Sequence, residues 1–133
     1  MALGLAAAAK SAACDAVVDR FDIGGAGTIQ IRSGTRPATA DTTATGTLLA
    51  TVTLANPAFG SASSGVATLS DPSAVTAVAT GTATWFRGLS GGAAAVFDGD
   101  VTATGGGGDL TLASTSITSG QSVDITGGTV TMP

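Results

Sequence analysis

The stretch GTLLATVTLANP, residues 46–57, decides the fold class, because its apolar residues recur at every second position. In an extended chain such residues share one face, and the residues between them face the other way. The inward series would be Leu48, Ala50, Val52 and Leu54. Thr51 and Thr53 would face outward, and Asn56-Pro57 would end the strand, since proline cannot donate a ladder hydrogen bond. The pattern predicts a half-buried β-strand over residues 47–54.

The same period of two recurs along the rest of the chain. Further strands are predicted over residues 28–32, 66–69, 75–79, 80–89, 93–97, 110–112, 123–125 and 130–132, with one more around Ile117. Between them lie turn clusters at Asp98-Gly99-Asp100, Gly105–Gly108, Ser119-Gly120 and Gly127-Gly128. About eight to ten short, threonine-rich strands at this spacing favour an all-β fold, an antiparallel β-sandwich or jelly roll.

The first 24 residues carry a different pattern, which predicts one N-terminal α-helix over residues 3–22. Alanine is the strongest helix former. One face would carry Leu5, Ala9, Ala12, Ala16, Val17 and Phe21. Gly24-Gly25 would end the helix, and since Lys10 interrupts the first apolar run we expect a retained helix and not a secretory signal. We therefore divide the chain into a helix with glycine linker, 1–24, and a β-sandwich domain, 25–133. The helix either packs on its own sheet or docks on a neighbouring subunit.

Composition excludes several classes of site. The chain has no His and a single Cys, Cys14, so the usual zinc and haem sites and the Ser-His-Asp and Cys-His nucleophile systems are not available. A net charge of −4 argues against a nucleic-acid partner. The sequence has no apolar stretch of about 18 residues, so we expect no membrane-spanning helix. Only 11% of residues are charged and large apolar side chains are few. We therefore expect self-association to add burial, as in a homo-oligomer.

Three carboxylates form the only candidate metal site. Asp98-Gly99-Asp100, with Asp109 after the glycine cluster, offers oxygen ligands of the kind Ca²⁺ takes. The spacing differs from that of a helix–loop–helix calcium loop, and Asp and Gly are also common turn residues. We interpret these residues as turns, and predict no metal, no cofactor and no enzymatic activity.

The segment Trp85-Phe86-Arg87 is the best candidate contact site. Successive strand residues point to opposite faces, so one of the two rings is left for a partner, the N-terminal helix or the long loop over residues 36–46. Trp and Arg are also enriched at interface hot spots. The alternative is that Trp85 fills the core while the helix or the loop covers Phe86. Leu3 and Leu5, at the far end of the helix, are further predicted contacts.

Four stretches together resemble small virion proteins of tailed bacteriophages, of the head cement or decoration type. They are GTLLATVTLANPAFG (46–60), GTATWFRGL (81–89), FDGDVTATG (97–105) and STSITSGQSVDITGGTVTMP (114–133). The resemblance implies a non-enzymatic structural protein of the virion, assembled in the bacterial host cytoplasm. Its partners would be the major capsid protein or other virion subunits, and it would stabilise the head by bridging capsid subunits. The alternatives are a neck, tail or fibre component, or a carbohydrate- or surface-binding β-sandwich module.

Overall fold

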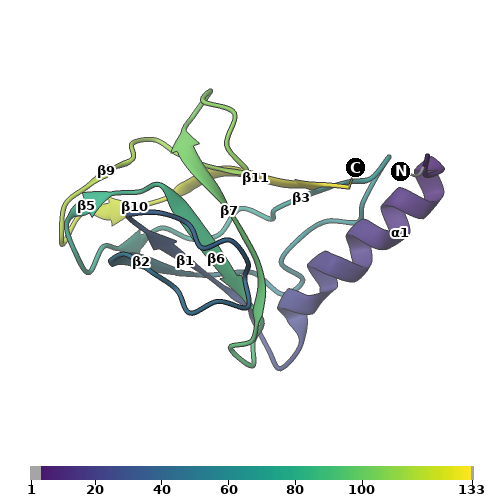
Figure 1. Ribbon diagram of the computed structural model, residues 1–133, viewed down its shortest axis with the longest axis horizontal. Helices are drawn as coiled ribbons and strands as arrows, with labels where there is room; N and C mark the ends of the chain where they lie inside the picture. The colour runs from purple at the N-terminus through teal and green to yellow at the C-terminus, as the bar shows by residue number, and fades with distance from the viewer. Residues whose placement is uncertain (1–3, 133) are drawn as a thin grey trace.

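The computed structural model describes residues 4–132, in which one N-terminal helix precedes eleven strands (Figure 1). Helix α1 spans Ala7–Val18, and the 3₁₀ turn η1 spans Asp19–Asp22. The strands are β1 Thr28–Arg32, β2 Leu48–Thr53, β3 Val66–Thr68, β4 Val75–Thr76, β5 Gly81–Thr82, β6 Trp85–Leu89, β7 Ala95–Ala103, β8 Leu110–Leu112, β9 Ser116–Ile117, β10 Ser122–Val123 and β11 Ile125–Thr131. The expectation of a mostly β chain with one N-terminal helix is confirmed.

The helix is shorter than expected, and the face that it buries agrees with the predicted one at Phe21 but not at its alanines. Cys14, Val18 and Phe21 are buried, at spacings of four and three, while Ala12 and Ala16 of the predicted face are exposed. The helix packs on β3 and β11, and its side chains are bonded to the segment before β3: Asp15 Oδ1 accepts from the Ala62 amide at 2.7 Å. The bulkier residues therefore determine which side of the alanine-rich helix meets the sheet.

Seven strands form the main sheet, in the order β2-β1-β6-β7-β8-β11-β3, and two small sheets pair β10 with β4 and β5 with β9. Every pair is antiparallel except β7 with β8, which is parallel. The sheet is therefore mixed, and the expectation of a purely antiparallel fold is wrong at this pair. The glycine-rich loop over residues 104–109 joins these two parallel strands. Side chains at Gly106 or Gly108 would collide with Thr102, so the loop packs closely against β7 only because these residues are glycine.

Two predicted turns lie inside strands. Asp98-Gly99-Asp100 belongs to β7, the longest strand, where Gly99 leaves room for the Phe86 ring; a Cβ at this position would lie 2.6 Å from that ring. Gly127-Gly128 belongs to β11, where Leu69 and Leu110 pack over Gly128. These glycines serve close packing across the sheet. The strand expected over residues 80–89 is in turn divided into β5 and β6.

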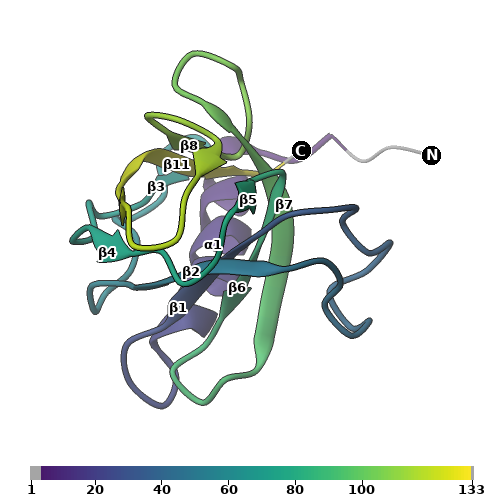
Figure 2. The same cartoon turned by 90° about the vertical axis from the view of Figure 1, so that its left-hand side faces the viewer.

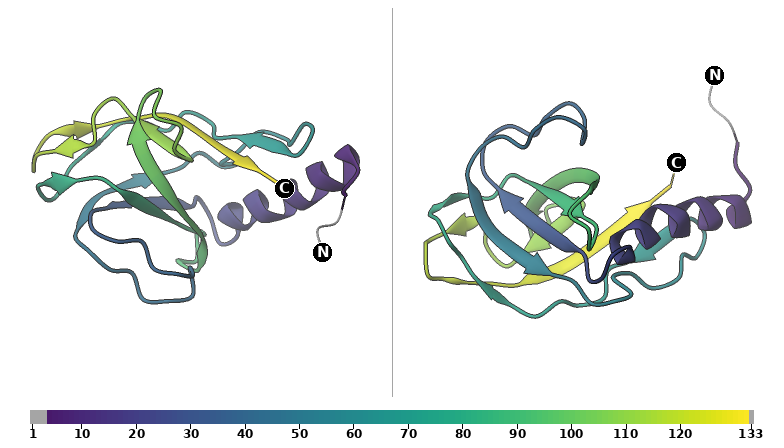
Figure 3. Two further views of the ribbon diagram at one scale, coloured as in Figure 1. Left: turned by 45° about the horizontal axis from the view of Figure 1, so that its top comes forward. Right: turned by 90° about the horizontal axis from the view of Figure 1, so that it is seen from below.

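The two halves of the main sheet enclose one core. β7 crosses from the half that contains β1, β2 and β6 to the half that contains β8, β11 and β3 (Figures 1 and 3). Buried side chains from both halves join a single cluster, among them Ile29, Ile31, Val52, Phe86, Leu110, Leu112 and Ile125. In the view of Figure 2, α1 lies behind the strands at the far end of the molecule. The inward series expected for β2 is confirmed for Ala50, Val52 and Leu54, and Leu48 is half-buried.

Candidate functional site

The residues of the predicted contact segment on β6 are all buried within the single chain. Trp85 is 1% exposed, Phe86 3% and Arg87 6%. Of the three covers expected for the ring outside the core, a partner, the N-terminal helix or the long loop, the structure shows the loop, and the chain itself covers both rings. The two rings do face opposite sides of the sheet, as strand geometry requires, and the two sides are covered in different ways.

Phe86 faces the core, where it meets other aromatic rings. Its ring lies edge-on to Phe97 at a centroid distance of 6.0 Å, and Phe97 in turn meets Phe21 of η1 at 5.3 Å. Gly88, two residues along β6, leaves the space that the Phe21 ring fills. The assignment of the two rings is thus the reverse of the expected alternative, because Phe86 belongs to the core cluster and Trp85 lies on the outer face.

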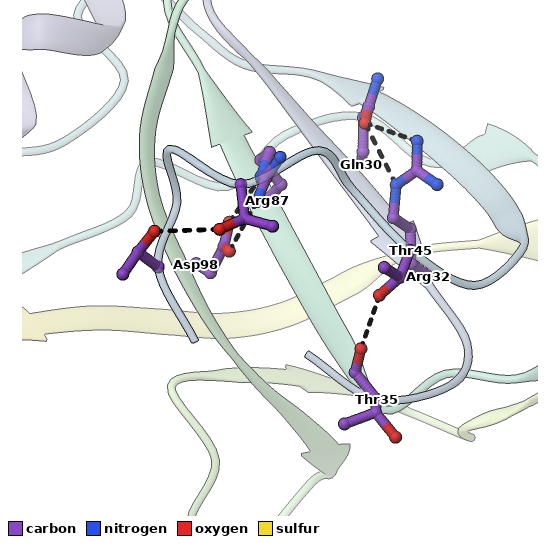
Figure 4. A network of polar contacts seen from close by, with 8 residues as sticks. Gln30, Arg32, Thr35, Thr45, Arg87 and Asp98 are labelled. Atoms are coloured by element: carbon purple, nitrogen blue, oxygen red, sulfur yellow. Dashed lines mark hydrogen bonds and ion pairs between the residues drawn. The ribbon is translucent and has the colours of Figure 1, made fainter. Parts of the chain in front are cut away.

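Trp85 is covered by the loop between β1 and β2, residues 33–47. Its Nε1 donates to the Ser33 carbonyl at 3.1 Å, and the Arg87 guanidinium lies 5.6 Å from the ring centroid. A hydrogen bond within the loop joins its two arms: the Thr45 hydroxyl donates to the Thr35 carbonyl at 2.7 Å (Figure 4). A long loop, and not a second sheet, therefore excludes water from this face.

A buried ion pair lies beside Trp85 under the same loop. Arg87 on β6 donates from Nε and Nη2 to the two carboxylate oxygens of Asp98 on β7, at 2.7 and 2.9 Å (Figure 4). The side chains are 8% and 5% exposed. The hydrogen bond to Asp98 raises the pKa of Arg87 above its ordinary value, against the effect of burial, and the charges of Asp98 and Asp41 add to the rise. Burial, followed by the charge of Arg87, lowers the pKa of Arg32. The pair links β7 to β6, and both carboxylate oxygens of Asp98 accept hydrogen bonds from Arg87.

The remaining carboxylates of the candidate metal site are also engaged. Asp109 Oδ2 accepts from the Asp100 amide at 3.1 Å, and Asp100 lies 3.5 Å from Arg36 in an exposed ion pair. Within residues 4–132 no group of three His, Cys, Asp or Glu side chains is placed to hold a metal ion. In this arrangement the three carboxylates bond to the protein.

A groove opens where β7 and β11 diverge beyond the start of β8. It has a volume of about 280 Å³ and is lined by Val17, Phe86, Phe97, Asp98, Gly99, Asp109, Thr129, Val130, Thr131 and Met132. Ligand pockets for small molecules usually have ~300–1,000 Å³, so the volume of the groove lies just below that range. The sequence carried no signal for it, because it arises from the difference in length between β8 and its neighbours.

Few large apolar side chains are exposed in the described part of the chain. Leu5 is 40% exposed, Ile23 50% and Val78 66%. Leu5 was a predicted contact and remains accessible to a partner, whereas Leu3 lies outside the described residues. Across residues 4–132, the search for a helix long and apolar enough to cross a membrane found none.

Comparison with known proteins gives no relative. No family model, no curated protein and no solved structure matches the chain.

Proposed function

We propose that this chain is a non-enzymatic structural protein of a tailed-bacteriophage virion, a capsid cement or decoration protein that stabilises the head by bridging capsid subunits. The proposal starts from the resemblance of the strand-forming stretches. Its structural support is a neutral surface at both edges of the main sheet, which suits repeated contact with other subunits.

The neutral edges are the observation that carries the proposal. Neither edge strand of the main sheet, β2 or β3, contains a charged residue, and neither does β11 beside β3. Their exposed residues include Thr51, Thr53, Thr68, Thr129 and Thr131. The backbone on the outer side of β3 bonds to residues 58–63, and that of β2 bonds to Val78, so these edges would meet a partner through their exposed threonine side chains. A neutral threonine surface can pack against another subunit without desolvating ions.

We also propose that the fold is a β-sandwich in the wider sense. The half of the sheet with β1, β2 and β6 would form one layer, and the half with β8, β11 and β3 the other. Support comes from the single core cluster that both halves share. The jelly-roll connection pattern remains a prediction.

The alternative of a carbohydrate-binding module gains no support from the aromatic residues. Sugar platforms use exposed rings, and all five aromatic residues belong to the described part of the chain. Four of them, Trp85, Phe21, Phe59 and Phe86, are buried, and Phe97 is half-buried between two of them. A neck, tail or fibre location remains an alternative within the virion proposal.

The proposal can be tested by adding purified chain to capsid shells assembled without it. We expect saturable binding at a fixed number of copies per capsid subunit, and a higher temperature of shell rupture. The edge variant Thr51→Lys with Thr53→Lys should weaken binding, because two lysine charges would have to be desolvated. The control Thr118→Lys, in an exposed turn, should bind as the unaltered chain does. Shells that neither bind the chain nor gain stability would overturn the cement role.

A further inference from the structure

We infer that the groove between β7 and β11 accepts the N-terminal segment of a second copy of this chain, residues 1–5, as an added β-strand. The inference rests on the proposed function, because it describes one contact by which copies in an assembly would be linked. Four observations carry it: the unpaired strand edges of the groove, its apolar lining, the alternation in the segment and the direction in which the segment leaves its own helix.

The β7 side of the groove is a strand edge without a partner strand in the described chain. β7 pairs with β6 from Ala95 to Asp100, but its pairing with β8 begins only at Val101. The Val101 amide donates toward β6, to Thr84 O at 3.1 Å, and the Asp100 amide donates the other way, to Asp109. Backbone groups alternate between the two sides along a strand, so those of Asp98 face the groove.

The β11 side has a matching edge. The Met132 amide donates toward β3, to Gly65 O at 2.8 Å, whereas the Thr129 amide donates to Asp109 O at 3.3 Å on the β8 side. By the same alternation, the backbone of Thr131 faces the groove. An extended segment that continues the line of β8 would thus find backbone donors and acceptors on both sides, as in β-strand addition.

The floor of the groove is mainly apolar, and both carboxylates that line it already bond to other groups of the chain. Half-buried Val17, Phe97, Val130 and Met132 line it, together with the Phe86 ring. Asp98 is paired with Arg87, and Asp109 accepts from the Asp100 amide. An occupant with no charged side chain therefore leaves no ionic group unpaired.

The N-terminal segment has the sequence that such a groove requires. In MALGLA, residues 1–6, large apolar side chains alternate with Ala and Gly: Met1, Leu3 and Leu5 would share one face of a strand. Leu5 is 40% exposed, and Ala6 has extended dihedral angles, φ −64° and ψ 150°. Five strand residues span about 16 Å, and the four residues 129–132 of the groove edge about 13 Å, so the segment is long enough to fill the groove.

The position of α1 favours a second copy over the chain's own segment. Val17, near the end of the helix, lies at the groove, while Ser11 Oγ accepts from the Gly65 amide, beside the end of β11. The helix thus starts beyond the mouth of the groove, and the chain before it turns across the helix axis (Figure 3). To reach its own groove the segment would have to run back beside the helix toward Val17.

Cross-linking between two single-cysteine populations tests the inference. Both carry Cys14→Ala; one carries Leu5→Cys and the other Thr131→Cys, and the control acceptor carries Thr118→Cys at the opposite end of the sheet. After mixing and mild oxidation, we expect at least ten times more cross-linked heterodimer with Thr131→Cys than with Thr118→Cys. Equal yields would overturn the inference. So would a chain bearing both Leu5→Cys and Thr131→Cys that closes on itself at a rate independent of concentration.

A peptide assay needs no change at Cys14 and covers the case in which that variant does not fold. The probe is the hexapeptide MALGLA, added to ¹⁵N-labelled chain that carries Leu5→Asp. We expect saturable amide shifts at Gly99 and Thr131, and none with the peptide MADGDA. A lack of shifts with MALGLA overturns the inference. If the chain still binds capsid shells, the proposed function survives that result; if the peptide binds while shells do not bind the chain, only the proposed function fails.

Discussion

The two faces of β6 are buried by different means. On the inner face, Phe86 packs with Phe97, and the residues around them come from both halves of the sheet and from η1. On the outer face, Trp85 and the Arg87–Asp98 pair are covered by one loop, residues 33–47, whose two ends are joined by the bond from the Ser33 amide to Thr47 O at 3.1 Å. Trp85 and Phe86 are almost equally buried. Exposing Phe86 requires the two halves of the sheet to separate, whereas exposing Trp85 requires only that the loop detaches.

Equal burial of two side chains therefore does not mean that the same free energy is needed to expose them. Local opening requires only that a segment with few apolar contacts detaches. The loop over residues 33–47 is mostly exposed, so it should detach from the outer face of β6 more readily than the core residues separate from the inner face. We expect substitutions on the inner face to lower global stability most, and substitutions on the loop to open the outer face first.

The largest effect is expected from Phe86→Ala. The substitution leaves a cavity between the two halves of the sheet, and such losses cost about 3–5 kcal/mol. The free energy of unfolding in urea measures it. Phe97→Ala, at a half-buried position, should cost less. A loss below about 1 kcal/mol for Phe86→Ala would contradict the role of this ring as the shared core of both halves.

Breaking the ion pair should have the next largest effect. Arg87→Met leaves the Asp98 carboxylate buried without its partner, which we expect to cost about 3 kcal/mol. The double variant Arg87→Met with Asp98→Leu should recover most of that loss, because no charge is then left unpaired. If the double variant is as unstable as Arg87→Met alone, the cost lies in packing against Trp85 and not in the charge.

A smaller and local effect is expected from Gly46→Ala. Gly46 has φ +73°, and an added Cβ would collide with the Ser33 carbonyl, so the loop must shift at a cost of about 2 kcal/mol. Trp85 is the only tryptophan, and its fluorescence should move to longer wavelength and become more accessible to acrylamide. The matched control is Gly105→Ala, which has φ +88° and open space around it. Unchanged Trp85 fluorescence in Gly46→Ala would show that the loop does not provide the cover.

The smallest effect on stability is expected from Leu5→Asp with Leu3→Asp. Leu5 is exposed and its substitution should change the free energy of unfolding by less than about 0.5 kcal/mol. Association between copies should nevertheless weaken about 100-fold, the value of removing two buried leucines. Sedimentation measures the association. A variant that loses stability but associates normally would show that Leu3 and Leu5 stabilise the chain's own fold and do not contact a second copy.

The parts of the fold that follow from the sequence are those set by local periodicity. The alternation in residues 47–54 predicted β2, and Thr28–Arg32 formed the expected strand, because one side of each strand is buried and a shift by one residue would expose it. The glycines were the main source of error. Asp98-Gly99-Asp100 has the composition of a turn, but the bond from Arg87 to Asp98 and the ring of Phe86 over Gly99 hold it in a strand.

The candidate site was only partly predictable for the same reason. That Trp85 and Phe86 face opposite sides follows from strand geometry, but which segment covers each ring depends on contacts between residues distant in sequence. Ser33 lies 52 residues from Trp85. The groove depends on where β8 starts relative to β7 and β11, which no local pattern encodes. Leu5 was predicted as a contact from its place at the end of the helix; it is exposed, and the contact itself stays a prediction.

The cement role is best tested by a density map of intact tailed-phage virions assembled in cells that produce this chain. We expect many symmetry-related copies on the head shell, each with the fold of residues 4–132 and each contacting capsid subunits through the neutral edges β2 and β3. Density for the chain confined to the neck, tail or fibre would contradict the cement role and leave a structural role. Virions in which no copy of the chain is found would contradict any structural role in the virion.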